Sequence, residues 1–119
     1  MTTLEASALQ TELERMAHIA GVSVAVATQG TDGLVLHAAG NDPARAPAAA
    51  ALGAALFVRA RAAAAAQDRG EVGFLRLQCT AGQLLAVPVG VAIVVLITDA
   101  AANAGRIRLE LLRAARELS

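Results

Sequence analysis

The sequence predicts a single α+β domain, residues 1–119, in which a five-stranded antiparallel sheet carries helices on both faces. Short apolar, β-branched segments separated by glycine-containing turns predict the strands. Two such segments precede one long helical segment and three follow it. With a helix at each end of the chain, the order is α-β-β-α-β-β-β-α. Tight turns between neighbouring strands favour hairpins, so we expect an antiparallel sheet.

The composition restricts how this domain can build its core. Hydrophobic residues make up 56% of the chain but aromatic residues only 2%, and alanine supplies much of the apolar count. Burial per residue is therefore modest, and self-association would add to it. The formal net charge is zero, and all ten basic residues are arginines spread along the chain. This dispersed charge gives no support to nucleic-acid binding.

The distribution of cysteine and of apolar runs indicates the cellular compartment. Cys79 is the single cysteine, which excludes an intrachain disulfide and fits a reducing environment. The N-terminus lacks the basic region and apolar run of a signal peptide. The longest apolar run, residues 84–97, is too short to span a bilayer and contains Pro88 and Gly90. We therefore expect a cytoplasmic protein with no direct membrane insertion.

The first helix is expected to begin at a capping box formed by Thr2 and Glu5 and to end near His18. Gly21 suits the chain reversal that follows the helix. The apolar stripe of this helix comprises Leu9, Leu13, Met16 and Ala20.

The first two strands are predicted over residues 22–28 and 34–38. The dipeptide Asp32-Gly33 between them is a common hairpin signal. Residues 40–43 then interrupt the regular structure before the long helix begins.

Residues 47–68 form the longest predicted helix, and it is apolar on nearly every side. At 100° per residue, one stripe carries Leu52, Ala55, Leu56, Arg59, Ala63 and Ala66. The opposite side carries Ala50, Ala54, Phe57, Arg61 and Ala64. Such a helix is expected to be covered on two sides, by its own sheet and by a second copy of itself across a two-fold axis. The alternative is that alanine is simply a good helix former whose small methyl surface tolerates water.

Three further strands follow the long helix as a meander. They are predicted over residues 71–79, 84–87 and 91–98. Val72 and Phe74 are expected on one face of the first of these strands, and Leu75 and Leu77 on the other. The last strand is apolar throughout, as expected of a central strand that is covered on both faces.

The last helix is expected to be capped by Asp99 or Asn103. Leu109 and Leu112 lie off its main stripe and are expected to meet the first helix. The main apolar stripe comprises Ile107, Leu111, Ala114 and Leu118.

The side chains that could support catalysis do not form a recognisable constellation. No serine lies in a Gly-x-Ser-x-Gly elbow, and no glycine-rich phosphate loop with a lysine is present. His18 suits a solvated helix end, His37 an edge strand and Cys79 a small core position. Neither the histidines nor the cysteine have the spacing of metal ligands. We therefore expect no enzyme activity, no cofactor and no metal site.

The charged residues are interpreted mostly as parts of solvated surfaces. Glu110, Arg113 and Glu117 suit a solvated face of the last helix. Arg59 is different, because it lies in the middle of the apolar stripe of the long helix. It either extends its tip to water or marks the rim of an interface, where arginine is enriched. A further interpretation is a catalytic arginine that acts on a partner's nucleotide.

Several stretches in a fixed order resemble one known family. They are residues 21–26 (GVSVAV), 31–36 (TDGLVL), the alanine-rich helix, 84–90 (LLAVPVG), the apolar strand ending at Thr98, and 105–110 (GRIRLE). Together they cover nearly the whole chain. On this pattern the sequence resembles the Roadblock family, the small domains related to dynein light chains.

The resemblance implies a homodimer or heterodimer in which the long helices pair and the third strands join two sheets into one. It also implies a non-catalytic platform for Ras-like small GTPases, which similar bacterial proteins bind as dimers. The dimer interface expected from the apolar helix and from the family comprises Leu52, Ala55, Leu56, Arg59, Ala63, Ala66, Val72 and Phe74. Arg59 and Arg61 are the candidate contacts with the GTPase.

An alternative function keeps the fold but replaces the partner with a small ligand. Profilin-like and PAS-like sensor domains also use antiparallel sheets, and they require a sizeable cavity between sheet and helix. Polar groups that could orient a ligand are scarce in the apolar segments of this chain. The sequence therefore favours the GTPase-binding module over the sensor.

Overall fold

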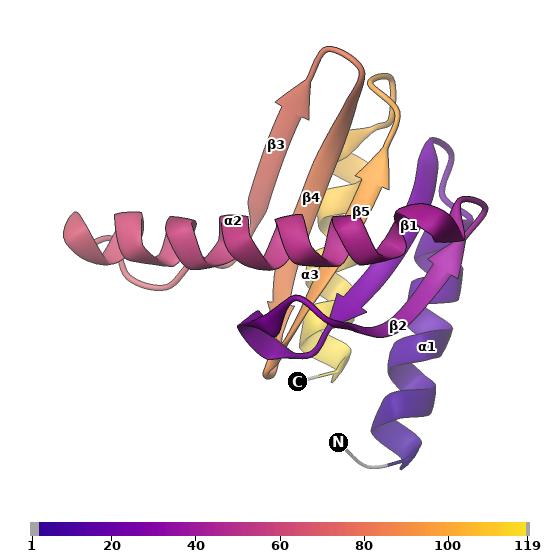
Figure 1. Ribbon diagram of the computed structural model, residues 1–119, viewed down its shortest axis with the longest axis horizontal. Coiled ribbons are helices and arrows are strands. Elements are labelled where there is room, and N and C mark those ends of the chain that lie inside the picture. Colours follow the sequence, from indigo (N-terminus) through magenta and orange to yellow (C-terminus); the bar gives the residue numbers. More distant parts are fainter. Residues whose placement is uncertain (1–2, 119) are drawn as a thin grey trace.

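The chain folds into three α-helices and five strands in the predicted order (Figure 1). The computed structural model describes residues 3–118. Its elements are α1 (Thr3–Ala17), β1 (Val22–Thr28), η1 (Gly30–Asp32), β2 (Val35–Gly40), η2 (Pro43–Arg45), α2 (Ala46–Ala66), β3 (Leu75–Cys79), β4 (Gly82–Val89), β5 (Ala92–Thr98) and α3 (Ala104–Leu118). The strands form one antiparallel sheet in the order β2-β1-β5-β4-β3. The predicted fold class is confirmed.

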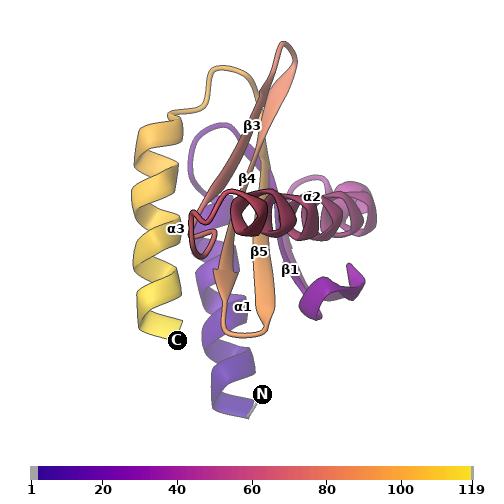
Figure 2. The same ribbon diagram turned by 90° about the vertical axis from the view of Figure 1, so that its left-hand side faces the viewer.

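The sheet carries α2 on one face and α1 with α3 on the other (Figure 2). Successive residues of the central strands alternate between these two faces, so each face has its own hydrophobic core. The core under α1 and α3 includes Ala25, Ala27, Leu85, Val94 and Leu96. The core under α2 includes Val24, Val26, Ala86, Ile93 and Val95. The predicted burial of the last strand on both faces is confirmed.

Helix α1 buries three of its four predicted stripe residues. These three are Leu9, Leu13 and Met16. The prediction for Ala20 is wrong, because Ala20 is exposed and Ile19 is buried instead. The N–H of Ile19 donates to the carbonyl of Met16 at 3.0 Å, a bond between residues three apart. This tighter turn after the helix changes which residue faces the core, so Ile19 points inward in place of Ala20. Thr2 lies outside the described residues, and with it the predicted capping box.

The loop between β1 and β2 covers residues 29–34, one residue more than the predicted strands leave between them. Strand β2 begins one residue later and ends two residues later than the predicted range 34–38. The N–H of Gln29 donates to the carbonyl of Leu34 at 2.8 Å and closes this loop. Gly33 has a φ of 75°, and a Cβ atom there would lie 3.0 Å from the Cα of Ala51 in α2. Gly33 therefore provides both a left-handed turn and a close contact between the loop and α2.

Helix α2 begins at Ala46 and ends at Ala66, two residues short of the predicted end at residue 68. The N–H of Arg69 donates to the carbonyl of Ala64 at 2.9 Å, and Asp68 takes a φ of 52°, so the chain turns out of the helix there. The sheet-facing side comprises Ala46, Ala49, Ala50, Gly53, Ala54 and Phe57. This confirms the predicted sidedness of the helix.

The closest approach of α2 to the sheet is at Gly53. A Cβ atom on Gly53 would lie 2.4 Å from Cγ2 and 3.2 Å from Cβ of Val95 on β5. Real Cβ atoms do not come this close to a neighbouring carbon, so only glycine fits here without a shift of the helix. The small side chains on either side of Gly53 keep the whole helix close to the strands.

The predicted strand over residues 71–79 is confirmed only from Leu75 onward. Residues 71–74 bring the chain back from the end of α2 to the sheet and make no ladder with β4. The prediction that Val72 and Phe74 share one face is therefore wrong. Val72 packs against the core under α2, whereas Phe74 packs against the core under α1 and α3.

Strands β4 and β5 form a longer hairpin than the sequence predicts. Strand β4 extends through Pro88, which is accommodated because β3 pairs only with residues 82–86 and leaves β4 with a single neighbour at that point. Strand β5 begins at Ala92 and not at Val91, whose side chain is 88% exposed in the turn.

Helix α3 is capped by Asn103, whose Oδ1 accepts a hydrogen bond from the N–H of Arg106 at 3.0 Å. Leu112 is half-buried against the core under α1 and α3, as predicted, whereas Leu109 is 66% exposed and its predicted contact with the first helix is wrong. The predicted stripe is otherwise confirmed, with Ile107, Leu111 and Ala114 buried and Leu118 half-buried.

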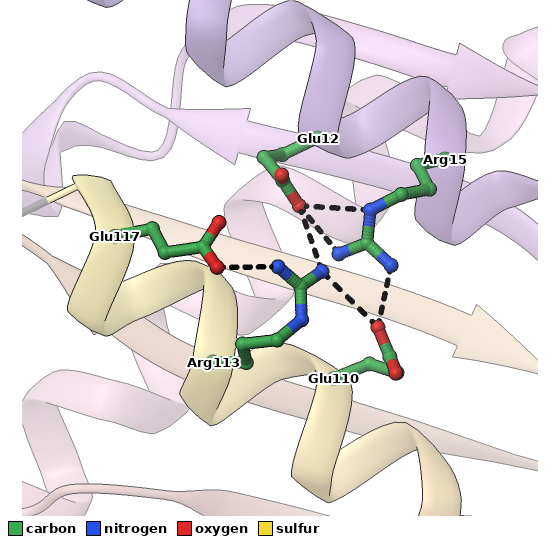
Figure 3. A network of polar contacts seen from close by, with 5 residues as sticks. All are labelled: Glu12, Arg15, Glu110, Arg113 and Glu117. Atoms are coloured by element: carbon green, nitrogen blue, oxygen red, sulfur yellow. Dashed lines mark hydrogen bonds and ion pairs between the residues drawn. The ribbon is translucent and has the colours of Figure 1, made fainter.

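An ion-pair network joins α1 to α3 (Figure 3). Arg113 donates to Glu110 at 3.2 Å and to Glu117 at 2.7 Å, which confirms the two predicted pairs. Glu12 of α1 accepts from both Arg113 and Arg15, and its side chain is only 15% exposed. Glu110 and Arg113 of α3 therefore form ion pairs with α1, and the prediction that they simply face solvent is wrong.

Gly53→Ala is expected to destabilise the protein, although alanine is the better helix former by about 1 kcal/mol. The added methyl group meets Val95, and overpacking of a core costs about 1–3 kcal/mol. We expect a net loss of about 1 kcal/mol in the free energy of unfolding, measured by urea denaturation. Gly105→Ala is the control, because a Cβ there would meet only Asn103 Oδ1 at 3.5 Å. A Gly53→Ala variant as stable as this control would contradict the tight fit.

Glu12→Gln is expected to lower the free energy of unfolding by about 1–2 kcal/mol, because it removes charge-assisted hydrogen bonds from two arginines in a mostly buried position. Glu14→Gln serves as the control, since Glu14 is exposed on the same helix and accepts from Gln10 at 3.1 Å. That change should cost less than about 0.5 kcal/mol. Equal effects of the two substitutions in urea unfolding would show that the network adds nothing to stability.

Candidate functional site

Helix α2 is longer than the sheet is wide. Its 21 residues span about 31 Å at about 1.5 Å per residue. Five strands about 4.8 Å apart span only about 19 Å from edge to edge. The C-terminal part of α2 accordingly extends beyond β3 (Figure 1), and no residue after Phe57 in this helix is buried. One end of an apolar helix is therefore left without a sheet beneath it.

The predicted interface stripe lies on the side of α2 that its own sheet leaves uncovered. Leu52 is 50% exposed, and Leu56 is half-buried because it also touches the core under α2. The other four residues, Ala55, Arg59, Ala63 and Ala66, are exposed. The stripe is therefore available for contact with another molecule.

A groove of about 640 Å³ lies beside Leu52 of α2, above the same face of the sheet. Its apolar lining comprises Leu52 from α2 and Leu77, Leu84 and Ile97 from the strands. Helix α2 covers Leu75 of β3 but leaves Leu77 41% exposed. The polar rim includes Ser23, Asp42, Arg45 and Asp99. The sequence predicted that Leu52 would be available for contact, but it did not predict that strand residues lie beneath it. The alternation of Leu75 and Leu77 along one strand face could have indicated this apolar floor.

The two edges of the sheet differ in how they are protected. At the β2 edge, Gln10 of α1 donates its side-chain amide to the carbonyl of Ala38 at 3.2 Å. At the β3 edge, every residue is exposed or half-buried, and within the described chain no side chain bonds to the β3 backbone. Strand β3 therefore presents an open row of backbone donors and acceptors next to the groove.

Two of the predicted interface residues lie apart from the stripe. Phe74 is on the opposite face of the sheet, where the guanidinium of Arg108 lies 5.5 Å from its ring centroid. Val72 is on the α2 face but is half-buried against the core. The predicted core position of Cys79 is wrong, because Cys79 is exposed at the end of β3 and lines the groove. An edge strand cannot bury its side chains as a central strand does.

Arg59 and Arg61 lie on nearly opposite sides of α2, since successive residues of a helix are about 100° apart. Arg59 belongs to the stripe beside the groove. Arg61 lies on the other flank, with its guanidinium 5.0 Å from the ring centroid of Phe57. Neither arginine forms an ion pair within the described residues.

Side chains suited to catalysis or metal binding are scattered over this structure. His18 is at the end of α1 with its Nδ1 2.7 Å from the carbonyl oxygen of Glu14, and His37 is in the edge strand β2. Among residues 3–118, no three His, Cys, Asp or Glu side chains converge in a way that could hold a metal ion. The features that come together are the apolar stripe, the groove and the open backbone edge of β3.

The region containing α2 also meets simple criteria for a membrane span. Within residues 43–66 an 18-residue window has a mean hydropathy of 1.4, and the segment is long enough to cross a bilayer. Core helices of globular domains meet the same criteria, and here the side around Gly53 packs on the sheet.

Comparison with known proteins identifies the family. The model of the Roadblock/LC7 domain matches residues 8–98. The chain belongs to the Roadblock/LC7 domain family. Roadblock domains are in general regulatory or adaptor modules and not enzymes. No curated protein sequence matches this chain significantly.

Solved Roadblock structures share the fold. Myxococcus xanthus MglB has a TM-score of 0.84 at 21% identity, covering 99% of this chain and 90% of that chain. A Roadblock/LC7 domain from Streptomyces avermitilis has a TM-score of 0.81 at 21% identity, covering 92% of each chain. A structure described as MglB with a tetrameric arrangement has a TM-score of 0.76 at 21% identity, covering 100% of this chain and 95% of that chain.

Proposed function

We propose that this Roadblock domain is a cytoplasmic homodimer that binds a Ras-like small GTPase and regulates or scaffolds it without contributing catalytic residues. The observation that carries the dimer is the match between two incomplete features of α2. Its C-terminal part has no sheet beneath it, and the groove beside its N-terminal part has no helix above it. A second copy related by a two-fold axis would complete both.

The open edge of β3 provides the position of that axis. Antiparallel pairing of β3 with its copy around Leu77 would extend one five-stranded sheet into the next. Because α2 covers Leu75 and not Leu77, the rotation places the second α2 beyond Leu77, along the groove. Each overhanging helix end would then lie over Leu77 and Leu84 of the other copy.

The residues of the stripe suit contact between two such helices. Leu52 lines the groove, and Leu56 and Ala63 share its side of α2, so all three would face the second helix. Small alanine side chains in the last part of α2 allow the two helix axes to approach to about 8 Å. Arg59 would extend its charged end along the helix surface to water at the rim of this contact.

Binding of a GTPase is inferred from the family and from the remaining surface of α2. Arg61 lies on the flank away from the groove, so it would stay accessible when two α2 helices pair. The ring of Phe57 orients the guanidinium group of Arg61 and leaves its positive charge unneutralised. A positive charge held in this way suits contact with an acidic surface. Arg59 would be a second contact at the rim of the helix pair.

A small-ligand sensor would use the same groove in a different way. The groove has the volume of a typical ligand site, and Ser23, Asp42 and Arg45 provide polar groups at its rim. A second copy of α2 in the groove would leave no room for such a ligand. The oligomeric state therefore discriminates between the two functions.

We expect sedimentation analysis to show a dimer of twice the 12.0 kDa chain. Leu52→Glu should weaken dimerisation at least about 100-fold, because it would bury an unpaired charge between the helices. Leu52 is already 50% exposed, so the monomer should stay folded. Leu109→Glu, at a 66% exposed leucine on the other face, should leave the dimer intact. A wild-type monomer at high concentration would contradict the proposal and favour the sensor.

We expect the immobilised dimer to retain a Ras-like GTPase from the same genome in one nucleotide state, GDP or a non-hydrolysable GTP analogue. Arg61→Glu should weaken this binding about tenfold, because it replaces an accessible positive charge with a negative one. Arg116→Glu, on the opposite face of the sheet, is the control and should leave retention unchanged. If no such GTPase is retained in either state, the partner is wrong even if the dimer is observed.

A further inference from the structure

Two exposed arginines lie on the face of the sheet opposite α2. Arg76 of β3 donates from Nε to Gln83 at 2.9 Å and from Nη2 to Gln78 at 3.1 Å. Arg108 of α3 lies over the ring of Phe74, 5.5 Å from its centroid. Phe74 packs on this face two residues before Arg76, so the two Cα atoms are about 7 Å apart along the chain. Each guanidinium group is therefore held in place by uncharged neighbours on the same face.

Neither arginine is neutralised by a carboxylate. All ion pairs within residues 3–118 involve Arg15, Arg45 or Arg113. The two carboxylates of α3, on Glu110 and Glu117, are turned toward α1 and take part in the network there (Figure 3). The groups that orient Arg76 and Arg108 are amides and an aromatic ring, which carry no net charge. Two positive charges in fixed positions without a counter-charge favour an anionic ligand.

The proposed dimer would double this arrangement. Pairing of the β3 strands places Arg76 and its copy on either side of the two-fold axis, on the face opposite the α2 helices. The strands would form the floor of a trough and the two α3 helices its walls, with Arg108 on each wall. The arrangement across the two chains rests on the proposed function, whereas Arg76 and Arg108 are both present in a single chain.

We propose that the surface formed by Arg76 and Arg108 in each chain, the acidic-segment site, binds an acidic polypeptide segment of a partner protein. Guanidinium groups recognise carboxylates through paired hydrogen bonds, and Nη1 of Arg76 makes no hydrogen bond to the described residues. A helix is about 10 Å in diameter, so the floor lies well below the crest of each α3. A flat bilayer would rest on those crests and could not reach Arg76.

The test uses a fluorescein-labelled peptide of alternating glutamate and alanine and measures anisotropy with the full-length protein. We expect saturable binding that weakens at least tenfold between 50 and 300 mM salt. Arg108→Gln and Arg76→Gln should each weaken it about fivefold. Arg108→Gln leaves the hydrogen bonds of Gln83 intact, so its effect cannot come from a disturbed loop. Arg76→Lys should retain part of the affinity, because the charge remains.

Arg106→Gln is the matched control for this experiment. Arg106 is also an exposed arginine of α3 without an ion pair among the described residues, but it lines a different pocket with Ile19 and Asp99. Its replacement removes the same charge and should leave the affinity for the peptide unchanged. Equal losses for Arg106→Gln and Arg108→Gln would indicate general attraction to positive charge and would overturn the proposal.

Sedimentation of the same samples separates this proposal from the proposed dimer. A monomeric protein that binds the peptide in an Arg76-dependent way supports the acidic-segment site and contradicts the dimer. A dimer that does not bind the peptide overturns the acidic-segment site alone. Arg76-dependent binding of phosphatidylserine vesicles or of a single-stranded oligonucleotide, without binding of the peptide, would also overturn it.

Discussion

The rest of this structure depends on the close packing of α2 against β5. At Gly53 the helix comes so near to Val95 that a methyl group cannot be inserted, and the neighbouring contact residues are almost all alanine. Phe57 is the one large side chain on this buried side. A helix that lies so close to the strands buries backbone and methyl groups and not long side chains, so much of its remaining apolar surface stays outside the core.

Because α2 is longer than the sheet is wide, part of its apolar surface stays uncovered and available for contact. A helix fixed across the strands and longer than the sheet must extend beyond one edge, and it does so beyond β3. The same placement leaves Leu77 and Ile97 uncovered along the groove. Gln10 protects the other edge of the sheet, so the unfinished features collect at the side where β3 is open. In the proposed dimer, a second copy of the same chain would fill these features, because each copy contributes one excess helix end and one vacant groove.

The opposite face of the sheet is organised by charge. The network between α1 and α3 takes up Glu12, Glu110 and Glu117, which draws the negative charge of this face toward α1. Arg76 and Arg108 are left on the β3 side with neutral neighbours. The two faces of one sheet thus offer different chemistry: an apolar surface, to which we assign self-association, and a basic surface, to which we assign an acidic segment.

The sequence by itself determined the class of fold, the order of the elements and the sidedness of the helices. Ala50, Ala54 and Phe57 face inward because a 3.6-residue period fixes which residues share a helix side, and this property is local. Only the tertiary structure decided that β3 begins at Leu75 and that Cys79 is exposed. It also decided that Val72 and Phe74 lie on opposite faces of the sheet. These outcomes depend on which strand lies at the edge and where α2 ends relative to it. The ion pair between Glu12 and Arg113 likewise joins residues 101 positions apart, and no local pattern encodes a contact at that separation.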